Sequence, residues 1–146
     1  MKKSMLALAI TMISFSSFSF ASDAPVINRN VISSFNKQFQ NAKEIKWDTR
    51  KNFIRAEFAI NNKVSYAYFN HNGDLIAVTR FLSPTQLPTE LLSTLKYNTG
   101  YWISDLFEIQ TETGTSYYVT IENGDQKEVL KSEGNNGWEY FQIIKK

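Results

Sequence analysis

Very few residues of this 146-residue chain could carry out acid–base or nucleophilic chemistry. The chain has no cysteine, which excludes thiolate catalysis, disulfide bonds and thiolate metal sites. Its single histidine, His71, lies in a predicted turn without the acid and serine that a catalytic triad requires. The carboxylates Asp74, Asp105 and Glu122 stand at turn and strand positions and form no paired acid–base motif. The sequence therefore predicts a protein that is not an enzyme.

Two glycine-containing segments fit turns better than ion or phosphate sites. NHNGD, at residues 70–74, brings oxygen-bearing side chains together, but a calcium loop needs several alternating oxygen ligands and a distal acid. GNNG, at residues 134–137, does not have the pattern of a glycine-rich phosphate loop and is better explained as a hairpin turn. We expect neither a metal ion nor a cofactor.

The first 21 residues are typical of a secretory signal peptide. Lys2 and Lys3 precede a short apolar run, and Ser19 and Ala21 are the small residues of a cleavage site. We expect cleavage after Ala21 and a mature protein in the periplasm or outside the cell, with no membrane segment. The alternative, an uncleaved membrane anchor, is disfavoured because the apolar run is too short to span a bilayer.

Removal of the leader leaves a chain without net charge. The leader holds two of the 16 basic residues and none of the 14 acidic ones, so the mature chain carries 14 of each. This balance argues against nucleic acid or an anionic membrane surface as partner, because both bind through a basic patch. A mature chain of about 125 residues suffices for one hydrophobic core, and we expect a single domain and a monomer.

Residues 31–42 predict an amphipathic helix. Its apolar residues recur at spacings of four, four and three and so share one face: Val31, Phe35, Phe39 and Ala42. Ile32 flanks this face. Beyond Ala42 the alternation of Ile45 and Trp47 indicates a strand.

A second helix is predicted after residue 82. Ser83 and Gln86 have the spacing of a capping box, and Pro84 stands at a permitted first helical position. Pro88 can restart the helix, and the apolar face consists of Leu91, Leu92 and Leu95. Because both helices are amphipathic, each must cover a hydrophobic surface, which we expect to be a sheet.

The strand at residues 54–60 has one apolar face, formed by Ile54, Ala56, Phe58 and Ile60. The following turn decides which residues of the next strand join that face. A three-residue turn at 61–63 pairs Phe58 with Tyr66, whereas a two-residue turn pairs Phe58 with Ser65. Matching apolar with apolar residues favours the longer turn, which also pairs Ile60 with Val64 and Ala56 with Tyr68.

The same test applied further along predicts a three-residue turn at 113–115. This turn pairs Ile109 with Val119 and Phe107 with Ile121. Tyr66 and Tyr117 then become equivalent inward residues.

Two Asn-Gly pairs, at residues 72–73 and 123–124, predict hairpins with type I′ turns, because both central residues of that turn need positive φ. After the first of them two registers stay open. Either Leu75 and Ala77 or Ile76 and Val78 face the core.

The segment SYAYFNHNGD, from Ser65, returns 51 positions later as SYYVTIENGD, from Ser116. The similarity extends to Val78 and Val129, which indicates two related units that share a core. Residues 137–146 supply a last strand. We therefore expect an α+β fold of two tandem helix-plus-antiparallel-sheet halves, at about 28–82 and 83–146, with the helices packed on one face of the sheet.

The opposite face of the sheet is the candidate binding surface. On the predicted register it carries the apolar residues Phe53, Phe69, Leu106 and Tyr118, interleaved with the charged residues Arg55, Glu57 and Glu108. Aromatic side chains among polar ones on an uncovered sheet can form a partner surface. The alternative is that these side chains pack on strand edges and loops.

Several segments resemble the PepSY-like, β-lactamase-inhibitor-protein-like (BLIP-like) family of secreted proteins from Bacteroidetes. They are FQNAKEIKWD from Phe39, YFNHNGDL from Tyr68, the Leu87-Pro88 pair before the second helix, and YYVTIENGD from Tyr117. The resemblance covers nearly the whole mature chain. It implies a periplasmic α+β protein of two helix-and-sheet halves, whose concave sheet in the namesake inhibitors grips a partner enzyme.

This chain departs from the namesake inhibitors in two respects. Those inhibitors are stabilised by disulfides, which a chain without cysteine cannot form. None of their inhibitory contact residues matches a position here. Most PepSY-like proteins have no established activity, so inhibition of a partner enzyme is a hypothesis.

Two functions are compatible with the sequence. The first is an envelope binding module that engages a protein or peptide through the uncovered sheet face, in the manner of a peptidase or hydrolase inhibitor. The alternative is a small-ligand carrier with a pocket between helices and sheet, lined by Tyr66, Tyr117 and Trp102.

Overall fold

The computed structural model describes residues 26–95, 100–134 and 137–146. The predicted signal peptide lies outside the described residues. The elements follow in the order α1 (Arg29–Gln38), β1 (Lys43–Thr49), β2 (Ile54–Ile60), β3 (Lys63–Phe69), β4 (Leu75–Phe81), the 3₁₀ turn η1 (Pro84–Gln86), α2 (Thr89–Thr94), β5 (Trp102–Thr111), β6 (Gly114–Glu122), β7 (Gln126–Ser132) and β8 (Glu139–Lys145).

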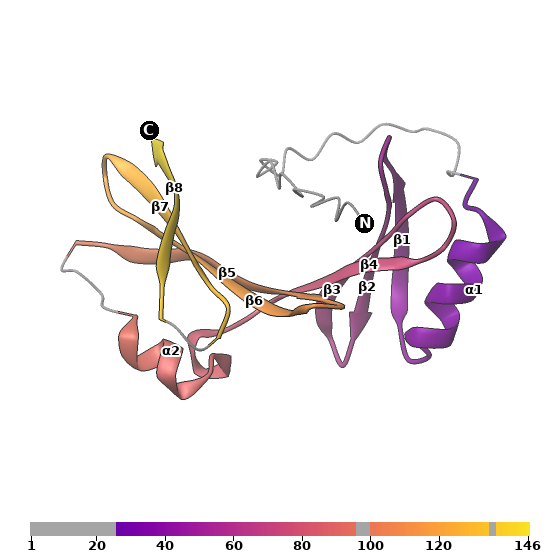
Figure 1. Cartoon of the computed structure of the whole chain (residues 1–146), viewed down its shortest axis with the longest axis horizontal. Coiled ribbons are helices and arrows are strands. Elements are labelled where there is room, and N and C mark those ends of the chain that lie inside the picture. The colour runs from indigo at the N-terminus through magenta and orange to yellow at the C-terminus, as the bar shows by residue number, and fades with distance from the viewer. Residues whose placement is uncertain (1–25, 96–99, 135–136) are drawn as a thin grey trace, which may run out of the picture.

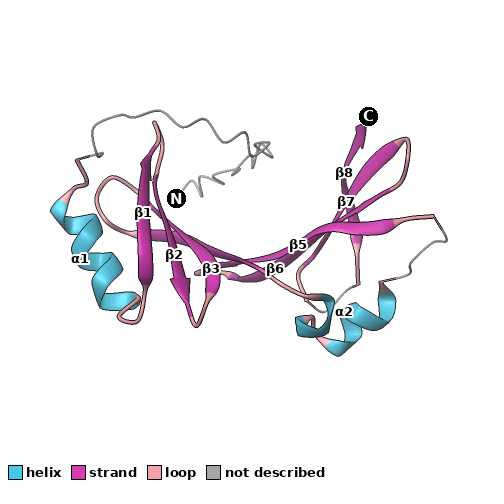
Figure 2. Cartoon of the chain, turned by 180° about the vertical axis from the view of Figure 1, so that it is seen from behind, coloured by secondary structure: helices cyan, strands magenta, loops and turns pink. Residues whose placement is uncertain are grey.

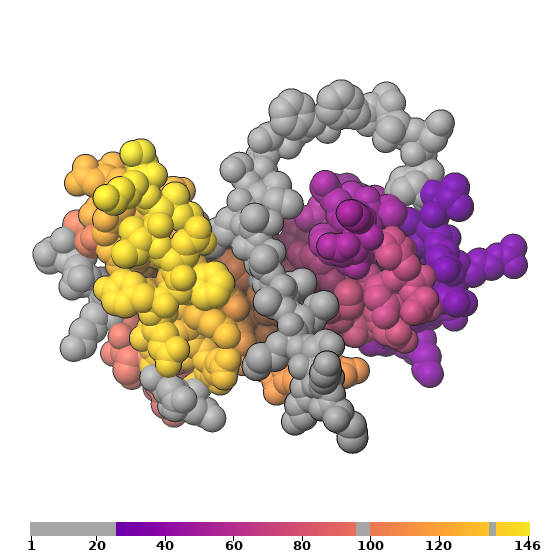
Figure 3. Space-filling view, turned by 45° about the horizontal axis from the view of Figure 1, so that its top comes forward, coloured from indigo at the N-terminus to yellow at the C-terminus, as the bar shows by residue number. Residues whose placement is uncertain are grey.

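The described strands form one antiparallel sheet in which each strand pairs with the next along the chain, from β1 to β8. The predicted α+β class is confirmed. The sheet is strongly bent, and both helices lie against its outer side (Figures 1 and 2). Figure 3 shows the N-terminal and C-terminal strands as two ridges, and Figure 1 shows β5 and β6 running between them.

The two faces of the sheet are distinguished by rows of paired residues. One row joins Phe58, Ser65, Arg80, Glu108 and Tyr117, each the cross-strand partner of the next. This side carries both helices, because Phe58 belongs to the cluster around α1 and Tyr117 packs against the cluster around α2. We call it the helix face, and we call the concave side without helices the open face.

Helix α1 begins at Arg29, where the Asn28 side chain caps it by accepting the backbone N–H of Asn30 at 2.9 Å. Its buried residues are Val31 and Phe35, as predicted. The helix ends at Gln38, earlier than the pattern suggested. The predicted apolar residues beyond that end, Phe39 and Ala42, still pack against the same core cluster.

The segment before α2 follows the predicted capping chemistry. Gln86 Oε1 accepts the backbone N–H of Ser83 at 2.9 Å, and Pro84 opens the 3₁₀ turn. Pro88 is the N-cap of α2, whose six residues bury Leu91. Leu92 is 37% exposed, so its predicted place on the buried face is wrong. Successive residues of a helix lie about 100° apart, and the side toward the sheet is the one that carries Leu91.

The turn between β2 and β3 has two residues, and the predicted three-residue turn is wrong. Asn61 and Asn62 both have positive φ, 52° and 61°, as a type I′ turn requires. Ile60 therefore pairs with Lys63 and Phe58 with Ser65. The one-residue difference moves each residue of β3 to the opposite face, so that Phe69 joins the core and Tyr66 and Tyr68 reach the open face.

The turn between β5 and β6 also has two residues, which contradicts the prediction for 113–115. Thr111 pairs with Gly114 at the turn. Further from the turn, the same register pairs Phe107 with Tyr118 and Leu106 with Val119. Leu106 and Val119 consequently lie in the core under α2.

Neither Asn-Gly pair forms the predicted type I′ turn, although both lie in hairpins. Between β3 and β4 only Gly73 has positive φ, and the Asn70 side chain accepts the backbone N–H groups of Asn72 and Asp74. Asn123 likewise accepts from Asp125 and Gln126 between β6 and β7. A side chain at the start of each turn thus satisfies backbone donors and fixes a different turn type.

Irregular pairing marks several strands. At the start of β4, Phe69 pairs with Leu75 and Tyr68 with Ala77, so Ile76 is an extra, bulged residue and neither of the two predicted registers holds throughout. The outer strands are irregular as well. β1 is interrupted between Lys43 and Lys46, and β8 opposite Val129 and Leu130.

The 51-residue similarity does not place its two copies on the same face. It aligns β3 with β6, and Tyr66 and Tyr117 hold the same position in their hairpins, opposite Glu57 and Glu108. Tyr66, however, lies on the open face and Tyr117 on the helix face. The prediction that both tyrosines point inward is therefore wrong.

Gly73 is expected to be the turn residue most sensitive to substitution. An added Cβ would lie 2.9 Å from the backbone carbon of Asn30 in α1, at a φ of +100° that strains any side chain. We expect Gly73→Ala to lower the free energy of unfolding by about 2 kcal/mol or more, measured by urea denaturation. Gly100→Ala is the control, because Gly100 has the same φ and an added Cβ there would have no other atom of the described residues within 4 Å. Equal losses for the two variants would show that the contact with α1 contributes nothing.

Candidate functional site

A row of aromatic side chains crosses the open face. It contains Tyr66 of β3, Phe81 of β4, Phe107 of β5, Tyr118 of β6 and Phe141 of β8, with successive ring centroids 6.2, 6.5, 5.2 and 5.5 Å apart. The row exists because antiparallel pairing brings Phe81 opposite Phe107 and Phe107 opposite Tyr118. Phe81 and Phe141 are 44% and 48% exposed, so the row presents apolar surface to solvent.

Charged residues border the row at its β3 end. The Arg55 guanidinium lies 5.3 Å from the centre of the Tyr66 ring and 3.3 Å from the Asp48 carboxylate. Beside it, Lys46 and Glu57 form an ion pair at 3.2 Å. Burial, with a smaller contribution from the nearby Glu57 carboxylate, raises the pKa of Tyr66, which therefore stays a neutral phenol.

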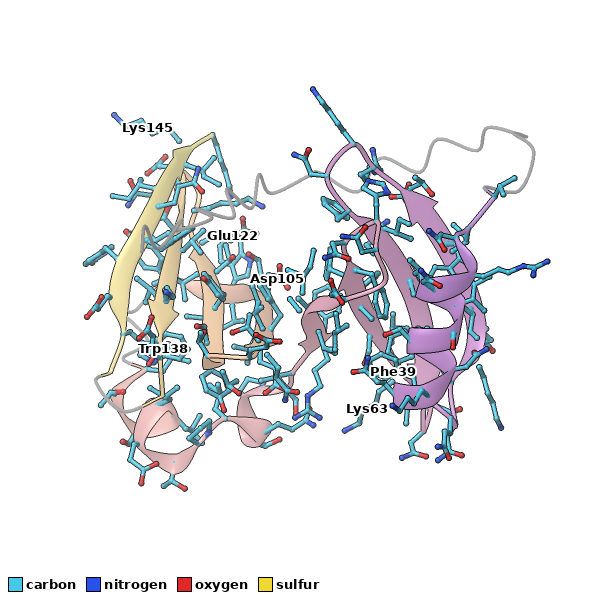
Figure 4. The ribbon with its side chains drawn as sticks, turned by 45° about the vertical axis from the view of Figure 1, so that its right-hand side comes forward. Phe39, Lys63, Asp105, Glu122, Trp138 and Lys145 are labelled. Atoms are coloured by element: carbon cyan, nitrogen blue, oxygen red, sulfur yellow. The ribbon has the colours of Figure 1, made fainter. Side chains whose placement is uncertain are left out.

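A second charged group borders the open face near the chain's C-terminus. The Glu122 carboxylate binds the Lys127 ammonium at 2.9 Å and accepts the Trp102 indole N–H at 3.0 Å. The hydrogen bond from Lys127 lowers the pKa of Glu122. Lys146 lies 5.2 Å from the Trp102 ring centre. Figure 4 shows Glu122 and Asp105 on the side of the sheet that faces the space between the two ridges.

Tyr118, at the centre of the row, is buried and has a shifted pKa. Burial raises the pKa of Tyr118, which is 9% exposed and stacked on Phe107 with the two rings nearly parallel. Lys131, the cross-strand partner of Tyr118, binds Glu133 at 3.0 Å, and this hydrogen bond raises the pKa of Lys131. The arrangement provides apolar contact, hydrogen bonds and charge, the components of a binding surface.

Four of the predicted binding residues lie on the open face. Arg55 and Glu57 face it on β2, and Tyr118 lies within the aromatic row. Phe53, just before β2, packs its ring against Tyr68 at 5.5 Å. Whether these residues bind a partner stays a prediction.

The other predicted positions belong to the helix face. Phe69 is fully buried under α1, and Leu106 is buried under α2. Glu108 lies between these clusters, buried and paired with Arg80. Phe69 was misplaced because the two-residue turn shifts β3 by one position relative to β2. Leu106 and Glu108 were misplaced because the other two-residue turn pairs them with Val119 and Tyr117, which exchanges the faces of β5.

Four aromatic residues of the row were missed: Tyr66, Phe81, Phe107 and Phe141. The signal for Tyr66 was the Asn61-Asn62 pair, since asparagine tolerates the positive φ of a two-residue type I′ turn. No local signal indicates that Phe81 lies beside Phe107, because 25 residues separate the partners and include α2.

The predicted ligand pocket is not formed. Tyr66 lies on the open face, Tyr117 on the helix face beside the α2 cluster, and Trp102 is half-exposed at the start of β5. The three side chains therefore do not line one cavity.

His71 and the carboxylates do not assemble a reactive centre within the described residues. The Nε2 atom of His71 lies 3.1 Å from the carbonyl oxygen of Lys51 in the neighbouring turn. Across residues 26–95, 100–134 and 137–146, no three histidine, aspartate or glutamate side chains gather as metal ligands would. None of the helices in those ranges has the length and apolarity needed to cross a membrane.

Solved structures with the same fold come from Bacteroides. A BLIP-like protein of Bacteroides fragilis matches with a TM-score of 0.69 and 18% identity over 82% of this chain and 86% of that one. A DUF2874 family protein of Bacteroides ovatus matches with a TM-score of 0.73 and 16% identity over 83% and 89%. A Bacteroides eggerthii structure described as "putative periplasmic proteins" matches with a TM-score of 0.72 and 12% identity over 83% and 90%.

These matches confirm the predicted resemblance at the level of the fold. The sequence matches no protein-family model. It also matches no curated protein. The residues that would bind a partner must therefore be argued from this chain alone.

Proposed function

We propose that this protein is a non-enzymatic binding protein of the cell envelope, which holds a protein or peptide partner on its open face. The aromatic row from Tyr66 to Phe141 carries the proposal. A few residues supply most of the binding energy at protein interfaces, aromatic side chains are enriched among them, and a polar rim surrounds them.

The concave shape of the open face suits a partner that projects between the two ridges (Figure 1). In this proposal the two tandem halves, at about 28–82 and 83–146, each contribute one ridge, and the mature chain begins after Ala21 in the periplasm or outside the cell. The similar structures include a BLIP-like protein, which supports inhibition of an envelope hydrolase as one form of the activity.

The test compares two exposed hydrophobic residues on opposite sides of the sheet. Mature protein is used to capture partners from the periplasm of the source organism, and a captured partner is purified and titrated against variants. We expect Phe81→Ser to weaken binding at least tenfold, a loss of about 1.4 kcal/mol or more in binding free energy, because it interrupts the aromatic row. Leu92→Ser is the matched control, since Leu92 is similarly exposed but lies on α2.

Thermal unfolding of both variants verifies that they are folded. Equal affinity of Phe81→Ser and the unsubstituted protein would exclude the open face as the binding surface. Assays of β-lactamases and envelope peptidases with added protein separate an inhibitor, which lowers their rates, from a scaffold, which does not.

A further inference from the structure

The centre of the open face combines a carboxylate, a hydroxyl and two aromatic rings in one block. Asp105 of β5 pairs with Thr120 of β6, and two residues further along the same strands Phe107 pairs with Tyr118. Residues two apart on a strand share a face, so these four side chains form two adjacent cross-strand pairs. Figure 4 places Asp105 toward the space between the ridges.

Asp105 has no cationic partner within 4 Å among the described residues, unlike Asp48, Glu57, Glu122 and Glu133 on the same side. Lys127, whose charge acts on Asp105, is held by Glu122 at 2.9 Å. Burial raises the pKa of Asp105, against the smaller opposing effects of the Leu106 backbone N–H and of Lys127. A cation brought to this carboxylate would therefore offset its loss of hydration.

The hydroxyl beside Asp105 also lacks a partner. Thr120 is 4% exposed, and its Oγ1 atom forms no hydrogen bond within the part of the chain that the structure describes. A buried hydroxyl without a partner is unfavourable, and a ligand that donates a hydrogen bond to it would remove that cost. Because this oxygen is closed to solvent, the side chains around it must move apart when the ligand binds.

The rings of Phe107 and Tyr118 complete the block. They are stacked with centroids 5.2 Å apart and an angle of 6° between their planes. Cations already lie over aromatic rings at both ends of the open face, where Arg55 covers Tyr66 and Lys146 covers Trp102. The cation beside the rings in the middle is Lys131, the cross-strand partner of Tyr118, and Glu133 binds it at 3.0 Å.

We propose that Asp105, Thr120, Phe107 and Tyr118 bind the cationic side chain of a lysine or arginine presented by a protein partner. The Asp105 carboxylate neutralises the charge, Thr120 Oγ1 accepts an N–H, and the two rings contact the cation and its methylenes. This inference rests on the proposed use of the open face and specifies the chemistry that the partner must offer there.

The test uses capped tripeptides, Ac-Gly-Arg-Gly-NH₂ and Ac-Gly-Lys-Gly-NH₂, with a citrulline peptide as the neutral analogue of arginine. Each is titrated into the ¹⁵N-labelled mature protein and followed by nuclear magnetic resonance. We expect saturable shifts at the amides of Asp105, Phe107, Thr120 and Tyr118 with the cationic peptides, and at least tenfold weaker binding of the citrulline peptide. Equal responses to arginine and citrulline would overturn the proposal.

Three variants assign the site. Asp105→Asn and Phe107→Leu should each weaken binding of the arginine peptide at least tenfold. Phe107→Leu does so without changing the charge of the protein. Glu44→Gln is the matched control for the charge change, because Glu44 is an exposed carboxylate on β1. Binding that tolerates Asp105→Asn as well as Glu44→Gln would contradict the proposal, and folding of each variant is verified from its spectrum.

The outcome is separable from that of the proposed function. If a captured partner loses affinity for Phe81→Ser but not for Asp105→Asn, the cation site is wrong and the open-face function stands. If the peptides bind at Asp105 while captured partners bind Phe81→Ser as tightly as the unsubstituted protein, the cation site stands and the proposed function fails.

Discussion

Replacing Phe35 with alanine is expected to lower the free energy of unfolding by about 3–5 kcal/mol, the range for truncation of a buried aromatic residue. Phe35 is 1% exposed and is the central ring of the cluster under α1. Its ring centroid lies 5.1 Å from Phe39, 5.2 Å from Trp47, 5.1 Å from Phe58 and 6.4 Å from Phe69. Alanine would leave a cavity between α1 and the sheet that these rings cannot all fill.

Urea denaturation followed by far-ultraviolet circular dichroism measures the loss. Ile32→Ala is the matched control, because Ile32 stands three residues before Phe35 on the same helix and is 38% exposed. We expect the control to lose less than about 1 kcal/mol. A Phe35→Ala variant as stable as the control would mean that α1 is not anchored through this ring.

Arg80→Ala is expected to lower the free energy of unfolding by about 2–3 kcal/mol. The Arg80 Nε donates to Oε1 of Glu108, a carboxylate that is 3% exposed on the helix face between the two helix-covered clusters. Without Arg80, the hydrogen bond from Gln110, at 2.8 Å, is the one that this carboxylate keeps among the described residues. An unpaired buried charge is strongly destabilising, but Arg80 is half-exposed and water can enter its place, so the loss falls below the largest values.

The double variant Arg80→Ala/Glu108→Gln separates charge from packing. Glutamine has nearly the shape of glutamate without its charge, so we expect the double variant to regain about half of the stability lost in Arg80→Ala. Thermal and urea denaturation give the comparison. A double variant less stable than Arg80→Ala would show that the cost lies in lost packing of the arginine rather than in the buried charge.

The elements that local patterns specify were predicted correctly. The apolar spacing of Val31 and Phe35 identified the buried side of α1, and the alternation from Ile54 to Ile60 identified the core side of β2. Each signal lies within one element and is repeated several times, so a single exceptional residue does not reverse it.

The register of the hairpins was predicted less well than the elements themselves. Matching Phe58 with an apolar partner favoured a three-residue turn, whereas the positive φ of Asn61 and Asn62 gives a two-residue turn that pairs Phe58 with Ser65. Cross-strand pairs need not be uniformly apolar, because the helix above the sheet also covers them. A shift of one residue then exchanged the faces of the whole following strand, and with them Phe69.

The candidate site was predicted in part for the same reason. Arg55 and Glu57 were placed correctly because β2 was, and Tyr118 reached the correct face although its predicted neighbour Leu106 did not. The aromatic row depends on pairing between β4 and β5 across α2. Only the folded chain brings Phe81 and Phe107 together.

The interrupted outer strands affect how copies of the protein can associate through the edges of their sheets. An open sheet ends in strands whose free N–H and C=O groups can template a further strand, and β8 bears the exposed Tyr140 and Ile143. Irregular pairing breaks the straight ladder at both borders, and Lys43, Lys46 and Lys145 add charge there. Fibril growth and strand exchange between copies are thereby opposed.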